Sequence, residues 1–182
     1  MAALNMLRRS DGAPAGDEPD ETRQFLTFQL SGETFAVSIL RIREILEYMA
    51  PTTVPLMPSF IRGVMNLRGA VVPVIDLSLR FAREETAIQR RTCIVIIEME
   101  HAEQCQLLGV LVDAVHEVLA IADSEIEPPP QFGSKIRVDF IEGMAKVEGR
   151  FVVLLNVDKV LSLEEMSLLS ELGHQETAGE EG

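Results

Sequence analysis

Basic side chains are scarce in this sequence of 182 residues. It contains 16 Lys and Arg against 29 Asp and Glu, which gives a formal net charge of −13. Residues 1–23 carry −2 of that charge and residues 163–182 carry −6, so −5 remains on the body at 24–162. An acidic body without a Lys/Arg stripe lacks the electrostatic footprint of a nucleic-acid-binding protein. It also lacks the basic cluster that holds proteins on anionic membranes, so we expect neither class of partner.

Long apolar runs are absent as well. A transmembrane helix needs about 18 consecutive apolar residues, and the longest runs here stop at Asp76, Asp113 or Asp158. A secretory signal is not expected either, because Arg8 and Arg9 follow the first short apolar stretch instead of preceding it. These patterns predict a cytoplasmic protein that does not insert into the membrane.

Only two cysteines are present, Cys93 and Cys105. They flank a predicted hairpin turn at His101–Glu103, and a turn centred there places them out of register for a cross-strand pair. We therefore expect two free thiols in a reducing compartment.

The sequence also lacks the common enzyme signatures. It has no glycine-rich phosphate-binding motif and no nucleophile elbow. Its three histidines are scattered and do not have metal-ligand spacing, and His116 and Glu117 would point to opposite faces of one strand. Asp76 could serve as a general base, but a helix cap explains it more simply. We expect no enzyme activity, no metal and no cofactor.

What is present is a mainly β pattern of period two. A turn at Ser31-Gly32, the hairpin already described and short β-branched runs predict strands at 25–30, 34–37, 71–75, 92–99, 104–112 and 151–155. Helix signals are few: Asp76 and Asn156 can cap short helices, and Ser162 with Glu165 forms a capping-box pattern that opens a final helix. The composition predicts disordered tails at 1–23 and 173–182 around one domain at 24–172.

An internal repeat organises this domain. Residues 59–81 align without a gap on 139–161, and residues 34–48 align on 107–121. Chance similarity between short apolar strands is the alternative explanation. Two glycines six residues apart in both copies (63 and 69, 143 and 149) favour a duplicated unit. A single small sheet buries little and exposes its edges, so we expect two β-barrel-like subdomains that share a core, with short helices.

Two short motifs are candidates for function. Arg68 lies in the turn Asn66-Leu67-Arg68-Gly69, and in the repeat it falls on Glu148, which has the opposite charge. The simple interpretation is a polar turn that varies freely; the functional one is a recognition turn that presents the donor fork of Arg68 to a partner carboxylate or carbonyl. Glu44 lies on an apolar stripe with Ile42, so we expect it either at an exposed rim or in an ion pair. Apolar residues next to one Arg and one Glu would suit a protein–protein surface.

At these motifs the sequence resembles the CheW family of chemotaxis coupling proteins. The resemblance rests on Gly63–Gly69 followed by Val72–Leu77, with support from Phe35–Val37, Ile42–Ile45, Val110–Asp113 leading into Val115, Val153–Lys159 and Glu164–Met166. It covers about residues 24–170, and the order and spacing of the motifs agree as a set.

The resemblance implies two intertwined five-stranded SH3-like barrels in a non-catalytic adaptor of a two-component signalling system. Such an adaptor holds the histidine kinase CheA, through its CheW-like regulatory domain, against the cytoplasmic tips of chemoreceptors. It implies recruitment to receptor arrays at the inner face of the membrane. Carried over by motif, the interface residues are Ile42, Glu44, Gly63, Asn66, Leu67 and Arg68, with Val112 in the second copy as a candidate for the apolar wall of the groove between the barrels.

Several other interpretations stay open at this stage. A CheW-like interaction module could serve another signalling or scaffold complex, and a detached CheA regulatory domain would have the same fold. An oligonucleotide-binding barrel is disfavoured by the acidic body and by the lack of an aromatic stacking strand. An enzyme would need a pocket near Asp76 and Glu44.

Overall fold

The computed structural model describes residues 21–162 except 82, 102 and 130–139, together with 165, 167 and 168. Almost all regular structure in this part of the chain is β. The strands are β1 (Thr22–Leu30), β2 (Glu33–Ser38), β3 (Ile42–Glu47), β4 (Ile61–Leu67), β5 (Ala70–Asp76), β6 (Cys93–His101), β7 (Gln104–Val112), β8 (Ala114–Ala122), β9 (Ile126–Glu127), β10 (Ile141–Val147) and β11 (Arg150–Leu155). Between them lie three 3₁₀ turns, η1 (Ile39–Arg41), η2 (Asp123–Glu125) and η4 (Val157–Lys159), and one helical turn, α2 (Leu77–Arg80).

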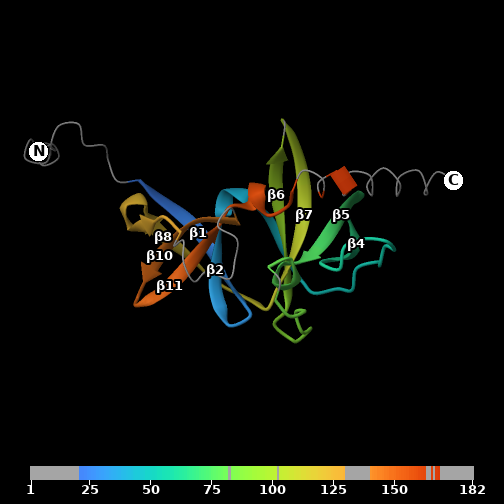
Figure 1. Cartoon of the computed structure of the whole chain (residues 1–182), viewed down its shortest axis with the longest axis horizontal. Helices are drawn as coiled ribbons and strands as arrows, with labels where there is room; N and C mark the ends of the chain where they lie inside the picture. The colour runs from blue at the N-terminus through green and yellow to red at the C-terminus, as the bar shows by residue number, and fades with distance from the viewer. Residues whose placement is uncertain are drawn as a thin grey trace, which may run out of the picture.

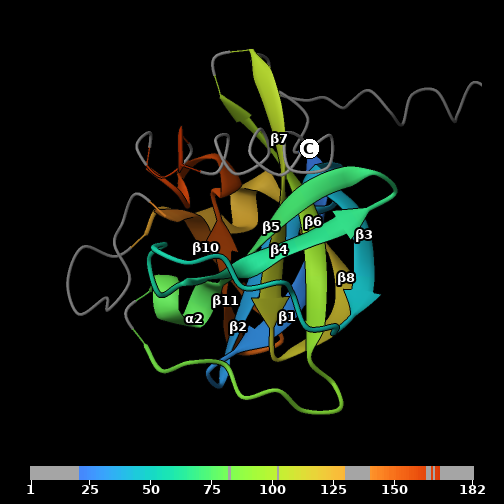
Figure 2. The same cartoon turned by 90° about the vertical axis from the view of Figure 1, so that its right-hand side faces the viewer.

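The strands form two sheets that stand side by side in Figure 1. The first sheet has the order β8-β1-β2-β11-β10-β9, and the second, which faces the viewer in Figure 2, has the order β3-β6-β7-β5-β4. Most neighbours pair antiparallel, but β2 pairs parallel with β11, and β5 pairs parallel with β7. The mainly β fold with two sheet units is confirmed.

The internal repeat is visible in this geometry. β4 and β10 span equivalent residues, 61–67 and 141–147, and each pairs with the next strand through a register shift at its glycine. The turns that follow are also equivalent, because Arg68 and Glu148 both have φ 52°. The units exchange strands: the first sheet contains β1 and β2 of the first copy and β8 to β11 of the second, whereas β6 and β7 complete the second sheet. This exchange is the intertwining that the family resemblance implies.

The two sheets share one core. Its largest cluster joins residues of the first sheet, such as Leu26 and Phe28, to residues of the second, such as Ile75 and Val95. β1 is buried on both faces from Phe25 to Phe28, because Leu26 and Phe28 pack with the second sheet and Phe25 packs among strands of the first, although the alternating sequence is typical of a half-buried strand. Four phenylalanine rings stack through this core with centroids 5.4–6.1 Å apart: Phe28, Phe35, Phe81 and Phe140.

Arg80 ties the two copies together at their junction. Its guanidinium carbon lies 5.2 Å from the ring centroid of Phe60 and 4.7 Å from that of Phe140, and these two phenylalanines are equivalent in the repeat. Arg80 Nε also donates to the carbonyl of Val160 at 2.9 Å, and Nη2 lies 3.2 Å from Glu165. A cation held between two aromatic faces and a carboxylate fixes the start of the C-terminal segment on the barrels.

The predicted caps are in place. Asp76 is fully buried, and its carboxylate accepts from the amides of Ser78 and Leu79 and from both the amide and the hydroxyl of Thr86. Asn156 accepts from the amide of Asp158 at 3.2 Å. A cap therefore explains Asp76, and the same side chain anchors the loop before β6.

Other expectations are met in part. The hairpin of β6 and β7 pairs Cys93 with Val112 and Cys105 with Glu100, and both thiols are free. β1 begins at Thr22, two residues before the expected start of the domain at 24. Ser162 and Glu165 exchange the two capping-box hydrogen bonds, but most of the predicted final helix and the end of the chain at 169–182 lie outside the described residues. No helix in the described part of the chain is long and apolar enough to cross a membrane.

Gly63 provides a test of this architecture. Its φ is +145°, and a Cβ there would overlap the backbone carbonyl of Thr52, which crosses β4 at an isolated bridge to Val64. Gly63→Ala should therefore lower the free energy of unfolding by about 2 kcal/mol or more. Gly32→Ala is the matched control, because Gly32 also has a positive φ (81°) but has no atom within 4 Å of the added Cβ. Chemical denaturation would measure the free energy of unfolding of both variants. Equal losses would show that the overlap with Thr52 is not the cause.

Candidate functional site

Glu44 comes from β3, an edge strand of the second sheet. β3 pairs with β6, and a register shift lies between Ile42 and Glu44, where Arg43 is the extra residue. Because of this bulge, Ile42 packs against the main core while the Glu44 side chain stays 26% exposed. The bulge thus places the carboxylate of Glu44 at the edge of the second sheet.

Arg68 comes from the turn between β4 and β5, at the other end of the same sheet. Asn66 Oδ1 accepts from the amide of Gly69 at 3.0 Å, which closes the turn, and Arg68 adopts the left-handed region with φ 52°. Asn side chains stabilise such turns through local hydrogen bonds of this kind. The turn is therefore held rigid, and Arg68 projects from it with 73% of its side chain exposed.

The two side chains meet in a bidentate ion pair. Arg68 Nη1 donates to Glu44 Oε1 at 2.5 Å, and Nη2 donates to Oε2 at 3.0 Å. The sequence predicts Glu44 either at an exposed rim or in an ion pair; the structure pairs it, and its partner is the arginine of the candidate recognition turn. Because β3 and β4 are the first and last strands of the sheet order, the pair joins the two edges of this sheet. It is also the planar fork-to-carboxylate geometry that makes Arg–carboxylate pairs directional.

The ion pair shifts the pKa of each partner in the direction that favours its charged form. The hydrogen bond and charge of Arg68 lower the pKa of Glu44 below its ordinary value of 4.5. The hydrogen bond from Glu44 and its charge raise the pKa of Arg68. Both groups are therefore charged at neutral pH, and the arrangement offers a fixed donor surface rather than a proton-transfer group.

A second ion pair and a thiol continue this surface. Arg43 Nε lies 3.1 Å from Glu98 Oε1. A hydrogen bond from Cys105, and then the charge of Arg43, lower the pKa of Glu98, while that hydrogen bond raises the pKa of the Cys105 thiol. Burial raises the pKa of Cys93. Thiols whose pKa is raised are poor nucleophiles, so these side chains do not form a reactive centre.

Of the remaining predicted site residues, Leu67 and Asn66 lie in or beside the turn of Arg68, whereas Gly63 and Val112 are buried. Leu67 is half-buried against a core cluster of the second sheet, next to Arg68. Asn66 is exposed, but its side chain serves the turn. Gly63 is buried, and its role is to admit the backbone of Thr52. Val112, the candidate for the apolar wall of the groove between the barrels, is 0% exposed inside the main core.

Some exposed apolar residues of β3, the segment after it and the loop before β4 were not singled out from the sequence. Ile45 and Met49 are about half exposed on β3 and just after it, and Leu56 is 100% exposed with φ 62°. For Ile45 the signal was available, since it belongs to the motif Ile42–Ile45 and alternates with Glu44. No sequence pattern marks Leu56, because its exposure follows from the path of the loop before β4. In the described part of the chain, no three His, Cys, Asp or Glu side chains are grouped to hold a metal ion.

The Glu44 titration provides a test of the pair. In the folded protein the carboxyl carbon of Glu44, followed by NMR, should titrate below its ordinary range. The stabilisation from the pair is then present above the unfolded-state pKa and is lost as the pH falls through the folded-state pKa. Arg68→Ala should return the titration of Glu44 to the ordinary range, whereas an unchanged titration in that variant would show that Arg68 is not the cause.

Comparison with known proteins agrees with this geometry. Residues 24–165 match the family model of the CheW-like domain. The chain is 31% identical over 172 residues to the chemotaxis protein CheW of Klebsiella aerogenes, covering 94% of this chain and 98% of that protein. It is 34% identical over 141 residues to CheW of Bacillus subtilis, covering 78% and 88%. The crystal structure of the scaffolding protein TtCheW from Thermoanaerobacter tengcongensis superposes with a TM-score of 0.72 at 32% identity, covering 80% of this chain and 96% of that one. The chain therefore belongs to the CheW family of chemotaxis proteins, which are non-catalytic adaptors.

Proposed function

We propose that this adaptor couples the cytoplasmic tips of methyl-accepting chemoreceptors to the regulatory domain of the histidine kinase CheA, within receptor arrays at the inner face of the membrane. We further propose that the surface around Glu44 and Arg68 is one of its interfaces. The observation that carries the second proposal is the bidentate pair itself, held on a rigid turn with most of the arginine exposed.

The composition of this surface supports an interface. The fork of Arg68 uses one N–H of each terminal nitrogen on Glu44, so its other donors remain available to a carboxylate or carbonyl of a partner. Leu67, which precedes Arg68 in the turn and is half-buried, supplies apolar area beside it. Arginine with neighbouring apolar side chains is the composition of interface hot spots.

Rigidity matters to the coupling role. A scaffold transmits a signal only if its contacts differ in free energy between two states of its partners. The Glu44 carboxylate and the turn closed by Asn66 orient Arg68, so a shift in a docked partner would change the length of its contacts with the guanidinium. The adaptor surface thus converts a partner's movement into a change in affinity.

The coupling role can be tested by co-sedimentation of the purified protein with CheA and receptor signalling fragments, scored by kinase phosphorylation. We expect a three-way assembly with altered kinase activity. A folded sample that binds neither component would remove the coupling role and leave the family fold intact.

The interface role of Arg68 can be tested by Arg68→Ala. Removing a charge that is paired across a desolvated interface costs about 2–5 kcal/mol, so binding should weaken at least about thirtyfold. Unfolding should change little, because exposed ion pairs contribute about 0–1 kcal/mol. The measurement is isothermal titration with receptor fragments and, separately, with the CheA regulatory domain.

Arg90→Ala is the matched control, because Arg90 is exposed and has no ion pair among the described residues. It should bind both partners as the unmodified protein does. Unchanged affinity of Arg68→Ala for both partners, together with an unchanged melting temperature, would show that this surface is not an interface.

A further inference from the structure

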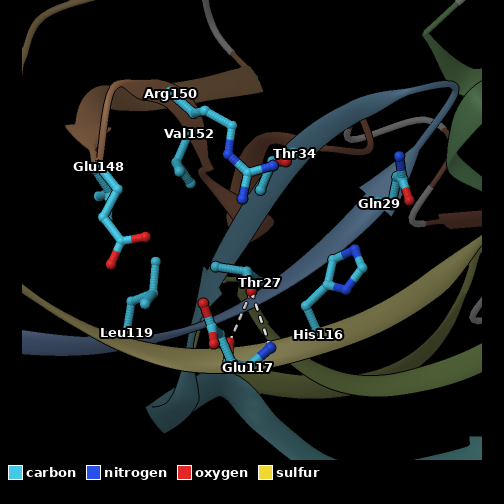
Figure 3. A pocket seen from close by; sticks show the side chains of 10 residues that line it. Thr27, Gln29, Thr34, His116, Glu117, Leu119, Glu148, Arg150 and Val152 are labelled. Atoms are coloured by element: carbon cyan, nitrogen blue, oxygen red, sulfur yellow. Dashed lines mark hydrogen bonds between the residues drawn. The ribbon is translucent and has the colours of Figure 1, made fainter.

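The first sheet has a hollow at the place that corresponds to the Glu44–Arg68 pair. It has a volume of about 360 Å³ and is lined by ten residues of β1, β2, β8, β10, β11 and the turn between the last two. Figure 3 shows Glu117 rising from β8 on one side and Glu148 reaching from the turn on the other, with Leu119 between them. Val147 and Val152 add further apolar lining.

The internal repeat allows this hollow to be compared with the Glu44–Arg68 pair. Glu117 occupies the position of Glu44, and Glu148 occupies the position of Arg68 with the same φ of 52°. In the second sheet, arginine bridges the edge strand β3 and the β4–β5 turn. In the first sheet the corresponding seam, between β8 and the β10–β11 turn, has a carboxylate on both sides.

Both carboxylates are exposed and lack a cationic partner among the described residues. Neither Glu117 nor Glu148 forms an ion pair there, and the hydrogen bonds of Glu117 with Thr27 use its backbone only. Arg150 lines the same hollow but lies more than 4.0 Å from both carboxylates. Its position is that of Ala70 in the first copy, so it does not replace the missing bridge.

We propose that this hollow is a binding site for an arginine side chain of a partner polypeptide, whose guanidinium bridges Glu117 and Glu148. Arginine fits for two reasons. Its planar fork can engage carboxylates on both sides of the seam, as Arg68 engages Glu44 with two nitrogens. Its aliphatic stem can lie against Leu119, Val147 and Val152, which a compact metal ion or water would leave uncovered.

The test is an NMR titration of the ¹⁵N-labelled full chain with Nα-acetyl-arginine amide, with the lysine and citrulline analogues at equal ionic strength. We expect saturable shifts of amides in β8 and the β10–β11 turn, with half-saturation in the millimolar range. The lysine analogue should bind more weakly and the uncharged citrulline analogue should not bind. Glu117→Gln should weaken binding of the arginine probe at least fivefold, whereas Arg150→Ala should retain it.

Glu148→Arg is the sharpest variant. The turn accepts arginine at this φ, because Arg68 adopts it in the first copy, so the variant should fold. It should close the seam with Glu117 and abolish binding of the probe. Glu127→Gln, which removes an exposed carboxylate of β9 outside the hollow, should bind normally.

The proposal is overturned if the arginine probe gives no saturable shift, if the citrulline analogue produces the same shifts, or if Glu148→Arg binds as the unmodified protein does. Neither the probe nor the readout involves the kinase or a receptor, so this outcome is independent of the coupling role.

Discussion

The parallel pairing between copies is the interaction on which the rest of the structure depends. β5 of the first copy pairs with β7 of the second, and β11 of the second pairs with β2 of the first. Each pairing places strands of both copies in one sheet, so neither copy has a complete sheet of its own. The shared core, the phenylalanine stack and the position of Arg80 between Phe60 and Phe140 all follow from that exchange.

The two sheets differ in the charges that they carry where their ends approach each other. Each sheet curls until an edge strand approaches the turn of the hairpin at its other end. In one sheet Glu44 and Arg68 join across that approach, and in the other Glu117 and Glu148 line one hollow without an ion pair among the described residues. The two sites therefore differ by the charge at one turn position. Arg68 completes an ion pair in the second sheet, whereas Glu148 leaves a site that we propose receives an arginine in the first. The two copies have the same backbone conformation at this turn and differ in the charged side chain that they present to a partner.

Much of this architecture could be predicted from residues alone. The turn glycines at 69 and 149, the hairpin turns and the caps at Asp76 and Asn156 are local features, and local stereochemistry decides them. The complete burial of Val112 could not be predicted, because it depends on the central position of β7 in its sheet and on how the sheets pack. The pairing of Arg68 with Glu44 was also beyond sequence reasoning. These residues lie 24 positions apart on opposite edges of a sheet, and only the curl of that sheet brings them together. The double burial of β1 also depends on tertiary packing, because Leu26 and Phe28 pack with the second sheet while Phe25 packs among strands of the first.

The strand exchange also bears on how such a chain can be divided. A cut between β5 and β6 would give two fragments, each able to form hairpins but neither able to complete a sheet, because each sheet needs β1 and β2 or β6 and β7 from the other side of the cut. Two equivalent fragments, however, could complete one another through the same parallel pairings. The arrangement is that of a strand-swapped homodimer whose two subunits have been joined end to end. Once joined, each copy was free to change its charges alone, which a symmetric dimer cannot do, because in a symmetric dimer every substitution appears at both rims.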